Sequence, residues 1–241
     1  MVTVRAGLAG GGVALAALLT ALSASVGLGP AGWGIGLGCG LTIGAALARS
    51  NAEMFGPADL ITLFRAVLAC ALAALVAESF VHSAAVGTLV ALAVVALVTD
   101  ALDGWLARRT GTGSTFGARF DGEVDAFVIL VLSAYVAATV HPWVLAIGLA
   151  RYAFAAAGWV LPWLRAHLPP RNWRRVVTAV QGVVLTTAAA AVLPAWLTTV
   201  ALLVAAALLG ESFGRDVLWL WRNPSRKSGR AGRTDLTVPR A

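Results

Sequence analysis

Charged residues and cysteines are scarce in this sequence. Only 12% of the 241 residues are charged and 59% are hydrophobic, whereas soluble domains carry about 25% charged residues. This scarcity excludes an ordinary soluble domain. Both cysteines, Cys39 and Cys70, lie inside apolar runs. We interpret them as small packing residues, because two such cysteines indicate neither a disulfide framework nor a metal site.

Long apolar runs are abundant instead, and the mean hydropathy is +0.85. A membrane span needs about 20 apolar residues, and the chain contains repeated runs near this length. We therefore predict an all-α, polytopic membrane protein whose spans form one bundle. The eight predicted spans are about 7–28, 31–48, 58–77, 82–107, 116–139, 142–164, 173–192 and 195–221.

The net charge of +7 reflects arginines at the ends of the spans. This position is typical of cytoplasmic loops and lipid contact and argues against a nucleic-acid partner. Arg or Lys follows every second predicted span, and the alternate turns near 29–31, 78–82, 140–142 and 193–195 contain neither. The alternation predicts an even number of spans, with both termini on the cytoplasmic side of the cell membrane.

Charge concentrates between the fourth and fifth predicted spans. Asp100 and Asp103 are three residues apart, and Asp121 and Asp125 are four apart. Each pair shares one helix face, and antiparallel neighbouring helices bring the pairs to one depth. Four carboxylates so close together repel one another, and divalent cations would remove the repulsion. Oxygen ligands suit Mg²⁺, Mn²⁺ or Ca²⁺, and two such ions about 3.5–4 Å apart form a clamp for phosphoryl transfer.

Small residues lie between the two aspartate pairs. Gly104 and Ala107 are one turn apart on the fourth span, and Gly117 precedes Asp121 by one turn. Small residues leave a helix surface open to an extended ligand. Close packing between membrane helices is the alternative interpretation of each glycine by itself.

These residues form one longer pattern at the junction of two spans. It reads Asp100-x2-Asp103-Gly104-x2-Ala107-Arg108-x8-Gly117-x3-Asp121-x3-Asp125. The pattern resembles the signature of the CDP-alcohol phosphotransferases, integral membrane enzymes that make phospholipid headgroups, and every fixed position is filled. The resemblance implies a six-span core over about 55–222, preceded by two extra spans within 1–50. From 223 to 241 we expect a basic, disordered cytoplasmic tail.

The resemblance implies an activity and a metal requirement. Members transfer a phospho-alcohol group from a CDP-alcohol, often CDP-diacylglycerol and in some members a CDP-choline-type donor, to an acceptor hydroxyl, and CMP leaves. Two divalent cations, Mg²⁺ or Mn²⁺, take part. By resemblance, Asp100, Asp103 and Asp121 hold one cation, and Asp100, Asp121 and Asp125 hold the other. Asp125 is also the expected general base. Homodimers are common in the family.

The resemblance also implies a nucleotide site. Gly104, Ala107 and Arg108 are expected to line the cytidine and diphosphate site, and Gly117 is expected to let the backbone approach the ligand.

A second short pattern lies upstream. Asp59-x2-Thr62-x2-Arg65 resembles the family's Asn-x2-Thr-x2-Arg, with Asp in place of Asn. The resemblance assigns these residues to nucleotide contact. For Thr62, a hydrogen bond to its own helix backbone is the alternative.

Four arginines suggest a pocket for an anionic acceptor. Arg119, Arg151, Arg174 and Arg175 lie near the predicted site, and family members that use glycerol phosphate or inositol phosphate carry basic residues in comparable places. The alternatives are topology signalling for Arg174 and Arg175, and an ion pair for Arg151.

Two pairs of acidic and basic residues are expected to have structural roles. Glu123 lies four residues after Arg119, and Glu211 lies four residues before Arg215. This spacing favours an ion pair within one helix in both cases. A further metal-binding role is the alternative for Glu123, and a polar wall of the active-site cavity is the alternative for the second pair.

Two other functions compete with the transferase. An ion- or proton-coupled transporter also carries acidic residues inside the membrane, although transporters usually place them near the midplane. A catalytically silent scaffold is the second alternative, and the complete set of aspartates argues against it.

Overall fold

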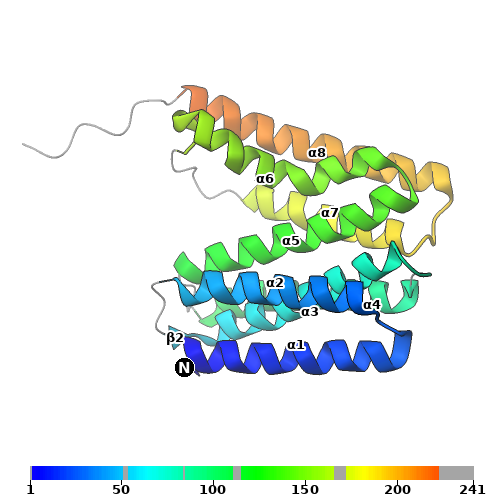
Figure 1. Ribbon diagram of the computed structural model, residues 1–241. Helices are drawn as coiled ribbons and strands as arrows, with labels where there is room; N and C mark the ends of the chain where they lie inside the picture. Colours follow the sequence, from blue (N-terminus) through cyan, green and yellow to red (C-terminus); the bar gives the residue numbers. More distant parts are fainter. Residues whose placement is uncertain (1, 51–53, 84, 111–114, 166–171, 223–241) are drawn as a thin grey trace, which may run out of the picture.

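The protein is a bundle of helices (Figure 1). The computed structural model describes residues 2–50, 54–83, 85–110, 115–165 and 172–222, and the side chains of all these except residues 103, 105–110, 115, 162, 165 and 172. The described helices are α1 (Val4–Val26), α2 (Pro30–Ala48), α3 (Pro57–Ser79), α4 (Val86–Thr110), α5 (Thr115–Thr139), α6 (Leu145–Val160), α7 (Asn172–Ala189) and α8 (Ala195–Arg222). Two short strands, β1 (Val2–Thr3) and β2 (Met54–Phe55), and two 3₁₀ turns, η1 (Pro142–Val144) and η2 (Pro162–Arg165), complete the described elements.

The prediction of an all-α polytopic membrane protein is confirmed. Each of the eight predicted spans corresponds to one helix, and most bounds agree within a few residues. Six described helices are long and apolar enough to cross a membrane. The apolar part of α4, Val86–Leu102, is shorter. Helix α7 lies outside the set of six because two arginines and other polar residues open it.

Local sequence explains where several helices begin and end. Pro30 and Pro57 occupy the first turns of α2 and α3, where the missing N–H is no loss. At α3, the Asp59 carboxylate accepts a hydrogen bond from the Gly56 N–H at 2.8 Å, which satisfies a backbone donor at the helix start. Helix α1 ends at Gly27, whose φ of 73° lies in the left-handed region that glycine tolerates.

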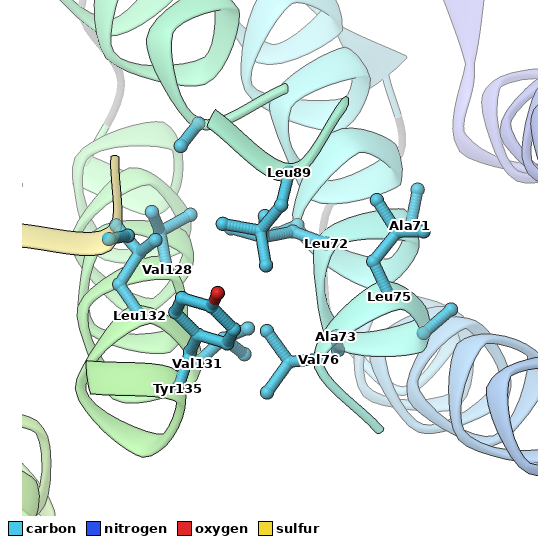
Figure 2. Packing of buried hydrophobic residues seen from close by; sticks show 14 of the residues in the cluster. Ala71, Leu72, Ala73, Leu75, Val76, Leu89, Val128, Val131, Leu132 and Tyr135 are labelled. Atoms are coloured by element: carbon cyan, nitrogen blue, oxygen red, sulfur yellow. The ribbon is translucent and has the colours of Figure 1, made fainter. Parts of the chain in front are cut away.

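Helix α3 is the centre of the bundle. In the apolar 18-residue stretch of α3, 72% of the residues are buried, compared with 50% for α5 and 22% for α6 and α8. Figure 2 shows Leu72 and Val76 of α3 facing Leu132 and Tyr135 of α5, with Leu89 of α4 beside them. The helix that carries Asp59, Thr62 and Arg65 is therefore enclosed on most sides.

The other helices pack around α3 and α5. Helices α1 and α2 cover one side of α3, whereas α6 and α7 pack against α5 and α8 packs against α7. Helix α6 comes close to α5 at Gly148, where an added Cβ would lie 2.7 Å from the Cα of Leu130. Helix α1 begins and α8 ends at the same end of the bundle (Figure 1). This arrangement agrees with the even number of spans predicted from the arginines.

Candidate active site

Three of the four predicted aspartates meet at one end of the bundle. Asp100 lies on α4, and Asp121 and Asp125 lie one turn apart on α5. One carboxylate oxygen from each lies within 4.8 Å of the others. The side chain of Asp103 is outside the described residues, although its place on α4 is three residues beyond Asp100. The predicted convergence of the carboxylates is therefore confirmed for three of the four.

Arg65 lies among these carboxylates. Its guanidinium forms ion pairs with Asp121 and Asp125, and its Nη1 lies 3.0 Å from Asp100. The arginine side chain is 2% exposed, whereas the three aspartates are 22–35% exposed. A guanidinium can bridge two carboxylates through its fork of donors. Arg65 therefore fixes the relative positions of α3, α4 and α5 at the site.

The charges of this site are unequal, because three carboxylates face one guanidinium. Fully ionised, they leave net negative charge in a half-buried place, which is costly unless a cation is added. Carboxylate oxygens are the ligands that Mg²⁺ and Mn²⁺ prefer. The described donor set therefore fits a divalent cation bound by Asp100, Asp121 and Asp125.

A small cavity lies directly beneath the cluster. Its volume is about 20 Å³, which is room for one water molecule. Arg65, Asp100 and Asp125 line its polar side, and Thr178 and Gly182 of α7 close it from the opposite side. The inner face of the site is thus closed, and a ligand as large as a nucleotide must approach from the end of the bundle.

Asp59 and Thr62 precede Arg65 by six and three residues on α3 and are buried. Asp59 caps the helix as described above, and the Thr62 hydroxyl donates a hydrogen bond to the Ala58 carbonyl at 3.2 Å. The backbone bond considered as the alternative for Thr62 is therefore present. Nucleotide contact by either residue remains a prediction.

The small residues expected at the nucleotide site flank the cluster. Gly104 is half-buried on α4 and Gly117 is half-buried near the start of α5. The side chains of Ala107 and Arg108 lie outside the described residues, although both positions belong to α4.

Arg151 of α6 pairs with Glu123 of α5. The Nη2–Oε1 distance is 2.6 Å, and the two side chains are 48% and 62% exposed. The expected pair between Glu123 and Arg119 is thus wrong, and the ion-pair alternative for Arg151 is confirmed. The cause is the close approach of α6 to α5. A Cβ added at Gly122 of α5 would lie 3.5 Å from Nη2 of Arg151.

The remaining arginines of the predicted acceptor pocket differ from one another. Arg174 is held by the buried Asp216 of α8, with an Nε–Oδ2 distance of 2.8 Å. Arg119 and Arg175 are exposed and form no ion pair with the part of the chain described here. Arg175 still acts on Asp100 electrostatically, so it lies near the cluster. Two of the four arginines, Arg151 and Arg174, are therefore paired with carboxylates in this structure.

The pair predicted within α8 is confirmed. Arg215 contacts Glu211, four residues earlier. Glu211 also accepts a hydrogen bond from the Trp173 indole N–H at 2.9 Å. This second bond ties the start of α7 to α8.

A larger concavity lies elsewhere. A groove of about 440 Å³ separates α6 from α8 and is lined mainly by apolar residues, among them Trp143, Phe154 and Phe213. It lacks the charged groups that the chemistry of the aspartate cluster offers. The cluster, rather than this larger groove, is the candidate active site.

Sequence reasoning missed two features of the site. Arg65 was expected to contact a nucleotide, and its place between the carboxylates depends on how α3 rotates against α5. Asp216 was not singled out, although an acidic residue near the end of a predicted span is itself a signal of a buried partner.

Comparison with known proteins supports the choice of the aspartate cluster as the candidate active site. A family model described as CDP-alcohol phosphatidyltransferase matches residues 55–209, which is well over half of the chain and includes the four aspartates predicted to bind metal. No curated protein and no solved structure matches the chain. The match begins at β2 and ends in α8, so α1 and α2 lie outside it. The chain belongs to the CDP-alcohol phosphatidyltransferase family.

Proposed function

We propose that this protein transfers a phosphatidyl group from CDP-diacylglycerol to the hydroxyl of an acceptor alcohol and releases CMP. The observation that carries the proposal is the convergence of Asp100, Asp121 and Asp125 around Arg65. Family membership supports phosphatidyl transfer from a CDP-alcohol. It also favours a transferase over the ion-coupled transporter.

Two divalent cations, Mg²⁺ or Mn²⁺, are the proposed cofactors. Asp100, Asp121 and Asp125 would hold them together with Asp103. When bound, they would supply positive charge to the donor diphosphate and to the departing CMP.

Asp125 is the proposed general base. It is the least exposed of the three described aspartates, 22% against 35% for Asp100 and Asp121, and Arg65 fixes its direction. The acceptor oxygen forms a bond to the phosphorus atom of the phosphatidyl group, and the bond between that phosphorus and the CMP oxygen breaks. The Asp125 carboxylate takes the proton of the acceptor hydroxyl.

The nucleotide is proposed to lie over the small residues beside the cluster. Gly104, Ala107 and Arg108 follow Asp100 on α4, and Gly117 lies near the start of α5. A small-residue surface admits a flat base and an extended diphosphate. Asp59 and Thr62 are proposed to support this site from α3.

A phosphorylated polyol, such as inositol phosphate or glycerol phosphate, is the proposed acceptor. Arg119 and Arg175 are exposed, and the exposed pair of Arg151 with Glu123 can open toward an anion at little cost, because exposed ion pairs contribute only about 0–1 kcal/mol. Arg174 would complete the pocket from its place beside Asp216.

The site is proposed to face the cytoplasm. The aspartates lie near the end of α4 and the start of α5. Figure 1 shows α5 beginning at the end of the bundle where α1 begins and α8 ends, and the basic turns predict that this end is cytoplasmic. The protein would thus reside in the cell membrane with both termini inside. Homodimerisation remains a prediction from the family resemblance.

The test uses the purified full-length protein in lipid nanodiscs. Labelled CDP-diacylglycerol is supplied with Mg²⁺ or Mn²⁺ and with inositol phosphate, glycerol phosphate or the unphosphorylated alcohols. We expect CMP release that needs both a metal and a phosphorylated acceptor. CMP release with the unphosphorylated alcohols alone would contradict the acceptor class, and no CMP release with CDP-diacylglycerol or a CDP-choline-type donor would contradict the transferase.

A further inference from the structure

Helices α1 and α2 lie outside the family match, yet they pack against α3, the helix that carries Arg65. Both contact α3, and α1 also contacts β2. They are therefore not a separate anchor beside the core. What they contact, and where, suggests a role for them in the site.

The first contact is made by the two short strands. Val2 and Thr3 of β1 pair antiparallel with Phe55 and Met54 of β2. Phe55 is fully buried and lies against Gly7 of α1, where an added Cβ would lie 2.6 Å from the Phe55 ring. The start of α1 thus fixes the Phe55 ring in one place.

A row of aromatic rings continues from Phe55 to the site. The Phe55 and Phe116 ring centroids are 6.5 Å apart, and those of Phe116 and Phe120 are 6.3 Å apart. Aromatic pairs at such separations attract each other beyond their simple burial. Phe120 directly precedes Asp121 on α5. The row of rings therefore connects Phe55 to the first turns of α5.

The row belongs to a compact apolar group that we call the Phe55 cluster. Its buried members are Val4, Leu47, Phe55, Leu63, Ala66, Phe120 and Val124. Ala66 is adjacent to Arg65 in the sequence, and Val124 is adjacent to Asp125. The cluster thus joins α1 and α2 to the sides of α3 and α5 that adjoin the charged residues.

The other end of the α1–α2 pair is also attached to α3. The Glu78 carboxylate, near the end of α3, accepts a hydrogen bond from the Gly32 N–H of α2 at 3.1 Å. An acidic side chain at a helix N-terminus satisfies backbone donors there and favours the helix dipole. The pair is thus attached to α3 at both ends.

We propose that α1 and α2, through the Phe55 cluster, set the position of the first turns of α5 against α3. Phe55 is then a positioning residue for the carboxylates that bind the metal ions. This inference rests on the proposed function for its effect on turnover. Its effect on metal binding does not depend on which substrates the protein uses.

The expected effect follows from how sensitive such sites are. Residues that orient metal ligands typically change metal affinity by about 10–100-fold when they are mutated. A displacement of about 1 Å can likewise cost about 100-fold in rate. A substitution that moves Phe55 without replacing any charged residue is therefore enough to test the proposal.

Glycines on one helix provide the probe and its control. In Gly7→Ala, the added Cβ meets the Phe55 ring. In Gly12→Ala, on the same helix, the added Cβ has no described atom within 4 Å. The measurement is the Mn²⁺ concentration that gives half-maximal CMP release, together with direct Mn²⁺ binding by electron paramagnetic resonance on the same full-length proteins.

We expect Gly7→Ala to raise the half-saturating Mn²⁺ concentration by about 10-fold and Gly12→Ala to leave it unchanged. Simple loss of folded protein lowers the maximal rate without moving this midpoint. Equal midpoints in Gly7→Ala, Gly12→Ala and the unmodified protein would overturn the proposal.

A second pair of variants covers a failure of Gly7→Ala to fold. Phe55→Leu removes the ring stacking and is expected to raise the Mn²⁺ midpoint. Gly7→Ala combined with Phe55→Leu is expected to fold, because the shorter side chain makes room for the new methyl group. An unchanged Mn²⁺ midpoint in Phe55→Leu would overturn the proposal.

The two proposals fail separately. If the unmodified protein binds Mn²⁺ but releases no CMP, the proposed function fails, and Mn²⁺ binding by the same variants still decides the role of Phe55.

Discussion

Arginine has two different environments in this bundle. Arg65 on α3 is 2% exposed and contacts three carboxylates. Arg151 on α6 and Arg215 on α8 are 48% and 64% exposed, and each pairs with one carboxylate. Within the described residues, the buried arginine pairs with the carboxylates of the cluster alone, whereas the other two pairs lie open to solvent. The same residue type thus fixes the geometry of the cluster in one region and forms single exposed ion pairs in the other.

The difference follows from the packing of the helices. Helix α3 is enclosed by α1, α2, α4 and α5. In its apolar 18-residue stretch 72% of the residues are buried, compared with 22% in that of α8. Breaking a buried ion pair leaves charge without solvent, whereas an exposed group recovers its hydration. Removing each arginine therefore tests the comparison directly.

The largest effect is expected for Arg65→Met. It leaves Asp100, Asp121 and Asp125 without their guanidinium, which should lower the free energy of unfolding by about 3–5 kcal/mol in the absence of metal. Added Mn²⁺ should recover part of the loss, because it binds the same carboxylates. Thermal unfolding in detergent, with and without Mn²⁺, measures both effects. The control is Arg5→Met, which removes an exposed arginine on α1. Equal unfolding temperatures for the two variants would contradict the structural role of Arg65.

An intermediate effect is expected for Arg174→Met. Arg174 is 33% exposed, but its partner Asp216 is 9% exposed, so the substitution leaves a nearly buried carboxylate unpaired. We expect a loss of about 1–3 kcal/mol. Asp216→Asn keeps an acceptor oxygen and should cost less. The unfolding temperatures of the two variants show which substitution destabilises the protein more. A larger loss for Asp216→Asn would contradict the cost assigned to the unpaired Asp216 carboxylate.

The smallest effect on stability is expected for Arg151→Ala, which should change the free energy of unfolding by less than about 1 kcal/mol. Its effect on binding should be larger. Because a hydrogen bond to a charged group contributes about 1.5–3 kcal/mol, the KM for a phosphorylated acceptor should rise by about 10-fold or more, with the KM of the donor unchanged. Glu123→Gln, which releases Arg151, should not raise the acceptor KM. An unchanged acceptor KM in Arg151→Ala removes Arg151 from the pocket.

The sequence predicted the features that depend on local periodicity. Apolar run length predicted the helices, and spacings of three and four residues predicted that Asp100, Asp121 and Asp125 would share one site. Features that depend on the rotation of one helix against another were not predicted. The ring of carboxylates around Arg65 is one such feature. The partner of Glu123 is another, because helix geometry pointed to Arg119 whereas the approach of α6 supplied Arg151.

The role of α1 and α2 was likewise not readable from the sequence. Both looked like additional spans, and nothing in their composition pointed to the aspartates. The contact between Gly7 and Phe55 and the row of rings to Phe120 depend on tertiary packing. Only the structure places these helices against α3 and connects them to α5 through the Phe55 cluster.

The central claim is that the aspartate cluster performs metal-dependent phosphatidyl transfer. The most direct measurement is Mn²⁺-dependent CMP release from CDP-diacylglycerol by the unmodified protein, by Asp125→Asn and by Glu211→Gln, which alters an acid on α8 outside the cluster. The account predicts that Asp125→Asn folds but loses at least about 100-fold in turnover, as expected when a general base is removed, whereas Glu211→Gln remains active. Full turnover by a folded Asp125→Asn protein would contradict it.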